Sequence, residues 1–273
     1  MPFFLQSCRY NPDVQWLFFT DCGVPPDAPE NVQFRVMSFT DYCNMVSVRL
    51  GIHFQPSSPY KLCDLKPALG YVHADNLAGF DFWGFSDIDL IYGNLRTHFT
   101  NARLSSFDLL STHERRISGH LCLLRNVRRM REAFMLSPSW REKLSSDEHL
   151  AFDESSFSRL FIRYKSWPTP LRNLANGLNP LWRCSDFAEA YSTPNGRVRW
   201  HDGSFNFPQR WIWKDGRLYN DQDGVRQFPY FHFIGWKSDA WPTRPKCELM
   251  GDATLAGRNA WCVTAEGFRE VTF

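Results

Sequence analysis

The chain has 273 residues, 43% of them hydrophobic and 22% charged, and its formal net charge at pH 7 is +2. This composition excludes a disordered chain, and the near-neutral charge gives no sign of nucleic acid binding. The sequence contains no run of about 18 apolar residues, so we expect no membrane-spanning helix. Eight cysteines without metal-ligand spacing, and no secretory segment before them, favour reduced thiols in a cytoplasmic protein.

The first half of the chain predicts alternating strands and helices. In chain order we expect a helix over 2–8, strands over 14–20 and 32–37, helices over 39–50 and 59–69, and a strand over 80–86. Such alternation is typical of a parallel α/β sheet. Ligands of these sheets bind beyond the carboxyl ends of the strands, which is where Asp21, Asp87 and Asp89 fall.

The second half predicts shorter elements. We expect a helix over 94–99, a strand over 118–124, a basic helix over 127–135, mainly helical structure over 139–165, a loop over 168–179 and short strands beyond residue 180. In the segment WIWKDGRLY, Asp215-Gly216 predicts the turn of a hairpin. Trp211 and Trp213 are two residues apart on this hairpin, a spacing that favours packing over sugar binding.

The most informative segment is Gly79 to Leu95, GFDFWGFSDIDLIYGNL. Asp87 and Asp89 are two residues apart after an aromatic strand, so both carboxylates are expected on one face at its end. Two such carboxylates repel each other and resist desolvation. A divalent cation removes both problems, and oxygen ligands suit Mg²⁺ or Mn²⁺. The alternative interpretation is a solvated turn.

A second signal is the segment Tyr230 to Lys237, YFHFIGWK. A histidine in an aromatic strand is often only a core residue. Here, however, His232 and Lys237 flank a glycine, which brings an imidazole and an ammonium group to one loop. A histidine can complete a carboxylate metal site, and a lysine can neutralise a phosphate.

Five segments together resemble bacterial polysaccharide-biosynthesis glycosyltransferases of GT-A type, including the galactofuranosyltransferase domains of O-antigen assembly enzymes. They are PYKLCDLKPALG (59–70), FDFWGFSDIDLIYGNL (80–95), SGHLCLLRN (118–126), FDE (152–154) and YFHFIGWK (230–237). The resemblance covers roughly residues 3–240. It implies a GT-A-like α/β fold, with a Rossmann-like, mainly parallel sheet flanked by helices and an irregular, β-rich C-terminal part. It also implies one domain over 1–273, with a nucleotide-sugar half (1–126), an acceptor half (127–240) and C-terminal strands (241–273).

The resemblance implies roles for individual residues. Metal ligands would be Asp87, Asp89 and His232, with Mn²⁺ or Mg²⁺ as the cofactor. The donor, a nucleotide-diphosphate sugar such as a UDP-sugar, would contact Thr20, Asp21, Lys61, Asp64 and Lys237. Gly119 and His120 would lie beside the donor sugar or the acceptor.

Sugar transfer also requires groups that stabilise the charge of the leaving diphosphate and accept the proton of the acceptor hydroxyl. A metal and a lysine stabilise the diphosphate leaving group. An inverting reaction further needs a carboxylate that takes the proton of the acceptor hydroxyl. The FDE match makes Asp153 or Glu154 the expected base, with Asp153 ahead. The alternative is that these acids only favour a helix N-terminus. For Gly119, the alternative is a tight start to a strand.

One departure concerns the N-terminus. Members of the resembled family begin further upstream, with a first strand and an aromatic-glycine loop that touch the nucleotide. We therefore expect a sheet that lacks this strand and exposes apolar edges, and we favour a wrongly assigned start codon as the reason.

The sequence analysis thus predicts a metal-dependent glycosyltransferase. Its acceptor would be a cell-surface glycan or lipid-linked glycan, reached by peripheral contact with the inner face of the membrane. Galactofuranose is a candidate sugar by resemblance alone. Two alternatives stay open, namely a non-catalytic carbohydrate-binding or assembly protein, and a metal-dependent phosphodiesterase or nucleotidyltransferase.

Overall fold

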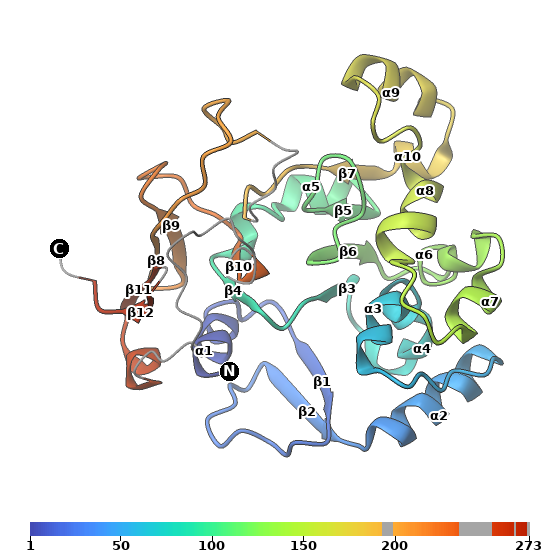
Figure 1. Ribbon diagram of the computed structural model, residues 1–273, viewed down its shortest axis with the longest axis horizontal. Helices are drawn as coiled ribbons and strands as arrows, with labels where there is room; N and C mark the ends of the chain where they lie inside the picture. Colours follow the sequence, from blue (N-terminus) through green and yellow to red (C-terminus); the bar gives the residue numbers. More distant parts are fainter. Residues whose placement is uncertain (193–198, 235–252, 265, 272–273) are drawn as a thin grey trace.

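The computed structural model of the protein is a mixed α/β structure with several small sheets (Figure 1). It describes residues 1–192, 199–234, 253–264 and 266–271. Its strands are β1 (Trp16–Thr20), β2 (Val32–Val36), β3 (Phe82–Ser86), β4 (Leu90–Tyr92), β5 (Leu109–Ser111), β6 (Leu121–Arg125), β7 (Ser185–Phe187), β8 (Trp211–Lys214), β9 (Arg217–Asn220), β10 (Tyr230–His232), β11 (Ala260–Thr264) and β12 (Gly267–Arg269). Its α-helices are α1 (Pro2–Arg9), α2 (Phe39–Leu50), α3 (Leu62–Leu65), α4 (Leu69–Val72), α5 (Asn101–Ser106), α6 (Arg128–Arg131), α7 (Trp140–Ser145), α8 (Ser158–Phe161), α9 (Thr169–Asn176) and α10 (Pro180–Arg183).

The prediction of one parallel sheet is correct only in part. Strands β1 and β2 are parallel but form a sheet of their own, and the sheet that contains β3 has the order β3-β6-β5-β7. In that sheet β5 and β7 are parallel, whereas β6 is antiparallel to both β3 and β5. The expected continuous parallel sheet is therefore wrong for β3, because its partner β6 runs in the opposite direction.

The helices α1 and α2 begin and end close to the predicted positions. The Ser38 side chain accepts a hydrogen bond from the Asp41 amide, and Gly51 ends α2 in the left-handed conformation. The predicted helix over 59–69 is instead a succession of short helical segments that includes α3 and α4. Pro67 interrupts it, because proline cannot donate a backbone hydrogen bond.

Two predictions about the middle of the chain need correction. The basic helix is shorter than expected, since α6 is a single turn. Its arginines bond within the protein, with Arg128 on Glu132, Arg129 on Asp108 and Arg131 on Asn126. The loop expected over 168–179 contains a helix, α9. Proline at the first helical positions fits this start, because its missing N–H would have no partner there.

The described core has three aromatic-rich clusters. One packs α2, α4 and neighbouring helices against β3 and β6, and another joins α1 to β4 and the β1–β2 pair. A third lies under the sheet of order β12-β11-β8-β9, where Trp211, Trp213 and Trp261 are fully buried. Burial of Trp211 and Trp213 confirms that they pack. The hairpin turn is also confirmed, because Asp215 and Gly216 both have positive φ.

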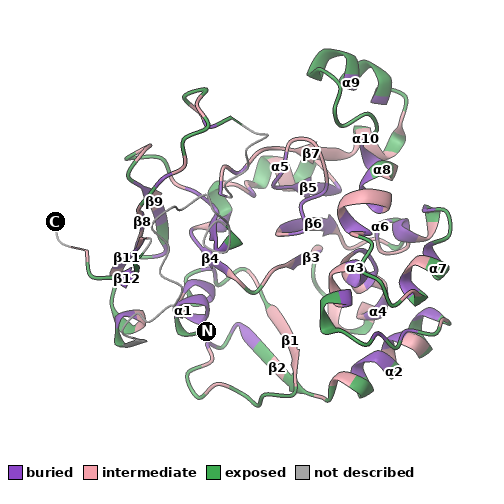
Figure 2. Ribbon diagram, in the orientation of Figure 1, coloured by how far each residue is buried: buried purple, intermediate pink, exposed green. Residues whose placement is uncertain are grey.

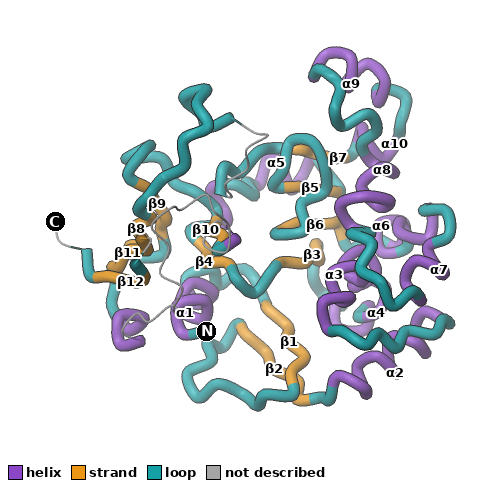
Figure 3. The backbone as a smooth tube through the Cα atoms, viewed as in Figure 1, coloured by secondary structure: helices purple, strands orange, loops and turns teal. Residues whose placement is uncertain are grey.

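Most helices lie on one side of the molecule and the C-terminal sheet lies on the other, as Figure 3 shows. Between them, β10 pairs with β4, which directly follows the carboxylates after β3. This pairing joins residue 232 to the region of residues 87–89 across more than half of the chain. In the part of the chain that the structure describes, no helix is both long and apolar enough to cross a membrane.

Candidate metal centre

Strand register brings three distant segments together at the end of β3. Because β3 and β6 are antiparallel with Ser86 opposite Leu121, the next residues, Asp87 and His120, are also neighbours. The Asp87 amide donates to the His120 carbonyl at 3.0 Å. The pairing of β10 with β4 places His232 opposite Leu90, and so beside Asp89.

The side chains of these residues converge as their backbones do. The Asp87 Oδ2 atom lies 3.2 Å from His120 Nδ1 and 4.0 Å from His232 Nε2. Asp89 Oδ1 lies 3.5 Å from the same His232 nitrogen. The two imidazole rings are 4.1 Å apart between centroids. The expected convergence of Asp87, Asp89 and His232 is therefore present, although a bend after β3 produces it in place of a continuous strand.

The geometry of this cluster fits a metal ion. Ligand atoms of Asp87, His120 and His232 all lie within 4.8 Å of one another. Ligands about 2.1 Å from one ion are separated by roughly 3 to 4.2 Å, so small side-chain adjustments would suffice. Imidazole ligands suit zinc, iron, copper or nickel and a carboxylate suits Mn²⁺ or Mg²⁺, so this mixed set is compatible with a first-row divalent metal. His120, which was expected beside the donor sugar or the acceptor, belongs to this cluster through its Nδ1 atom.

Lys66 is a site residue that the sequence analysis missed. Its ammonium group bonds to Asp87 Oδ1 at 2.5 Å and to the Gly119 carbonyl at 2.9 Å. The other Asp87 oxygen, Oδ2, is the one that faces the histidines. Lys66 thus orients the carboxylate and adds positive charge beside the cluster. The signal was in the sequence, because Lys66 lies in the same KLCDLKPALG segment as Lys61.

Charges around Asp87 favour its ionised form. Burial alone would raise the pKa of Asp87, but the hydrogen bond with His120 and the charge of Lys66 outweigh burial and lower it. Burial opposes the charge of Lys66 as well, yet the Asp87 carboxylate raises the pKa of that lysine. Both groups are therefore charged at neutral pH.

His232 is suited to be a neutral ligand. It is almost completely buried, and this burial lowers its pKa despite the opposing influence of Asp89. A metal binds the neutral imidazole, so a lowered pKa keeps His232 in the binding form at neutral pH.

Asp153 and Glu154 lie against Gly119, the residue that directly precedes His120 of the cluster. A Cβ atom at Gly119 would lie 2.8 Å from Asp153 Oδ2 and 3.3 Å from Glu154 Oε1, so the acids pack directly against this glycine. Glu154 also pairs with Arg116 at 3.3 Å. Burial raises the pKa of Asp153 to about 6, although Lys66 opposes the shift. This value suits proton exchange near neutral pH.

Lys61 and Asp64 are not brought to the cluster. Both side chains are fully buried, and they form an ion pair at 2.9 Å. Lys61 donates to the backbone carbonyls of Lys143 and Glu148, and Asp64 accepts from the amides of Leu150 and Phe152. The pair therefore joins α3 to the segment that precedes Asp153, a structural role in place of the predicted donor contact.

Three further residues were predicted to bind the donor, namely Thr20, Asp21 and Lys237. Thr20 ends β1 and Asp21 follows it, and the side chains of both contact the neighbouring Cys22. The structure does not bring them into contact with the metal cluster. Lys237 lies outside the described residues, so its contact with a phosphate stays a prediction.

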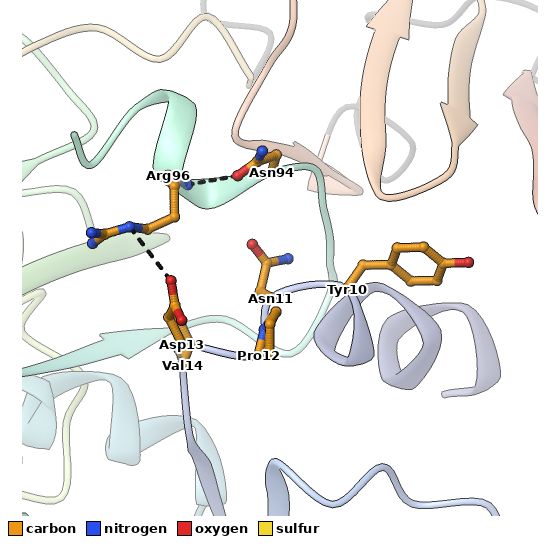
Figure 4. A pocket seen from close by; sticks show the side chains of 7 residues that line it. All are labelled: Tyr10, Asn11, Pro12, Asp13, Val14, Asn94 and Arg96. Carbon is orange, nitrogen blue, oxygen red and sulfur yellow. Dashed lines mark hydrogen bonds and ion pairs between the residues drawn. The ribbon is translucent and has the colours of Figure 1, made fainter. Parts of the chain in front are cut away.

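A separate small pocket lies where the chain leaves α1 (Figure 4). Its lining consists of Tyr10, Asn11, Pro12, Asp13, Val14, Asn94 and Arg96. The Asn11 amide is already bonded to the carbonyls of Ser7 and Gly93, and Asp13 faces Arg96 at 3.7 Å. The pocket shares no residue with the metal cluster, and its polar groups serve to connect α1 to the segment after β4.

The comparison with known families gives one match. The profile of DUF6625, a family of unknown function, matches residues 1–250. The chain belongs to this family. The matched region contains Lys66, Asp87, Asp89, His120 and His232, so the whole cluster lies within the DUF6625 part of the chain. No curated protein and no solved structure matches the chain.

Proposed function

We propose that this member of DUF6625 is a metal-dependent glycosyltransferase with a GT-A-like fold. It transfers a sugar from a nucleotide-diphosphate donor, taken here as a UDP-sugar, to a cell-surface glycan at the cytoplasmic face of the membrane. The observation that carries the proposal is the convergence of Asp87, Asp89 and His232, with His120 and Lys66 beside them. A site of paired carboxylates, imidazole and ammonium suits the diphosphate of such a donor.

Different residues would hold the metal ion and stabilise the charge of the leaving diphosphate. Asp87, His120 and His232 would hold the ion, with Asp89 beside His232 as a further oxygen ligand. When bound, Mn²⁺ or Mg²⁺ supplies a Lewis acid for the diphosphate oxygens. Lys66 fixes the orientation of Asp87 and adds positive charge where negative charge develops on the leaving diphosphate. Lys66 was not among the residues predicted from the sequence, which gave the diphosphate contact to Lys237 and a donor contact to Lys61.

The transfer itself needs a base if the configuration at the sugar inverts. The acceptor hydroxyl oxygen forms a bond to the anomeric carbon while the bond from that carbon to the phosphate oxygen breaks, and its electron pair leaves with UDP. The proton of the hydroxyl passes to a carboxylate, and Asp153 is the candidate, with Glu154 second. Its support is its position against Gly119, next to His120, and its raised pKa.

A donor screen tests this function. The full chain is incubated with Mn²⁺ and a set of UDP-hexoses, including UDP-galactofuranose, and released UDP is measured with and without a glycan acceptor. We expect UDP release that EDTA abolishes. Release should fall as pH drops below about 6, because protonated Asp153 cannot accept the hydroxyl proton.

The matched variants are Asp153→Asn and, as a control, Asp27→Asn in an exposed loop. Asp153→Asn should lower the release rate by about 10²-fold or more, and Asp27→Asn should leave it unchanged. Cleavage of simple phosphodiesters with no release from any UDP-sugar would instead favour the phosphodiesterase alternative. Binding of glycans without any turnover would favour the non-catalytic alternative.

A further inference from the structure

The helix α9 exposes an apolar face. Leu171 and Leu174 are three residues apart on α9, which places them on one side of the helix, and Leu178 lies in the turn that follows it. Their exposed fractions are 53%, 79% and 94%. Figure 1 shows α9 at the edge of the molecule, and in Figure 2 most of it has the colour of exposed residues. Clustered exposed leucines of this kind mark an interaction surface.

The opposite face of α9 is polar and buried. An amphipathic helix usually buries its apolar face and exposes its polar face, so α9 has the reverse arrangement. Arg172 and Asn176 are buried, although both are polar. The Asn176 side chain donates to the Arg163 carbonyl at 3.0 Å and accepts from the Arg163 amide at 2.8 Å. These bonds fix the rotation of α9 about its axis. The leucines therefore cannot turn inward without breaking buried hydrogen bonds.

Aromatic and basic residues are close to α9 in the sequence. Tyr164 and Trp167 stack at 4.3 Å between ring centroids and are 51% and 44% exposed. The stretch from 155 to 185 contains no aspartate or glutamate. Its basic residues are Arg159, Arg163, Lys165, Arg172 and Arg183, and all of them except Arg172 are exposed. The segment that includes α9 thus combines exposed leucines, amphipathic aromatic rings and positive charge.

We propose that α9, with the Tyr164–Trp167 pair, docks on an anionic lipid surface. Leucines on the outer face of a helix enter the boundary between headgroups and acyl chains, and tyrosine and tryptophan prefer that boundary. The exposed arginines and lysine attract anionic headgroups. A second copy of the chain fits less well, because a symmetric contact would bring two uniformly basic surfaces together. This inference rests on α9 and the segments next to it in the sequence, and it does not depend on the proposed sugar transfer.

Vesicle flotation tests the proposal. The full chain is mixed with vesicles of phosphatidylcholine alone, or of phosphatidylcholine with phosphatidylglycerol. We expect flotation with the anionic vesicles, and weaker flotation when salt is raised. The variant Leu174→Gln/Leu178→Gln should bind at least tenfold more weakly. Val48→Gln is the matched control, because Val48 is 83% exposed on a different helix, α2. Circular dichroism confirms that each variant is folded.

Three results would overturn the inference. They are no flotation with either type of vesicle, equal flotation of the double leucine variant and the wild type, and a dimer in light scattering that the double variant dissociates. The last result would assign the leucine face to a second copy of the chain. Replacing Arg163 and Lys165 by glutamine should weaken binding to the anionic vesicles only, which separates the charge contribution from that of the leucines.

Discussion

Replacing His232 by alanine is expected to lower the affinity for Mn²⁺ by at least a hundredfold. Loss of a residue that only supports a ligand already lowers metal affinity about 10- to 100-fold, and His232 would be a direct ligand. Calorimetric titration of Mn²⁺ into the metal-stripped chain measures the effect. His53→Ala is the control, because His53 lies exposed in a loop and should leave the affinity unchanged.

His232 is buried, so its loss could also disturb packing. Asp87→Asn and His120→Gln, at partly exposed positions, are therefore tested with it. All three variants should lose Mn²⁺ affinity while keeping the circular dichroism of the wild type. If the wild type bound no Mn²⁺, or if all three folded variants bound it as well as the wild type, the cluster would not be a Mn²⁺ site.

Replacing Lys61 by methionine is expected to lower the free energy of unfolding by about 3 to 5 kcal/mol. The substitution leaves the Asp64 carboxylate buried without its ammonium partner, and breaking a buried ion pair in this way has a cost of this size. Urea unfolding in the presence of EDTA measures it without a contribution from bound metal.

Lys66→Met is the informative comparison, because it removes a lysine from the same segment. Lys66 is partly exposed, so a smaller loss of stability is expected, together with weaker binding of metal and diphosphate. The reverse result would be a Lys61→Met chain of normal stability that fails to bind UDP. It would restore Lys61 as a donor-binding residue and contradict the structural role assigned to it.

The sequence predicted local features well. The predicted helix over 39–50 is α2, which the structure shows capped at Ser38 and Gly51, and the predicted turn at Asp215-Gly216 is present, because such signals act within a few residues. The convergence of Asp87 and Asp89 on His232 was also predicted, because the segments 80–95 and 230–237 both resemble segments of GT-A glycosyltransferases. The direction of β6 relative to β3 was not predictable in the same way, since strand pairing depends on contacts between distant segments.

Two errors have instructive causes. The interrupted helix over 59–69 carries two lysines, and only the three-dimensional path of the segment separates the buried Lys61 from Lys66 beside Asp87. The sequence predicts a loop over 168–179, whereas this stretch contains α9. Proline is also common in the first turn of a helix, and the exposed leucine spacing of α9 was the signal that indicated a helix.

The most direct test of the account is calorimetric titration of UDP into the full chain, first with Mn²⁺ and then with EDTA. We expect binding that requires Mn²⁺ and is lost in Asp89→Ala, while the control His53→Ala binds normally. Binding of UDP that persists in EDTA, or Mn²⁺ binding at Asp87, His120 and His232 without any binding of UDP, would contradict a nucleotide-sugar site at this metal centre.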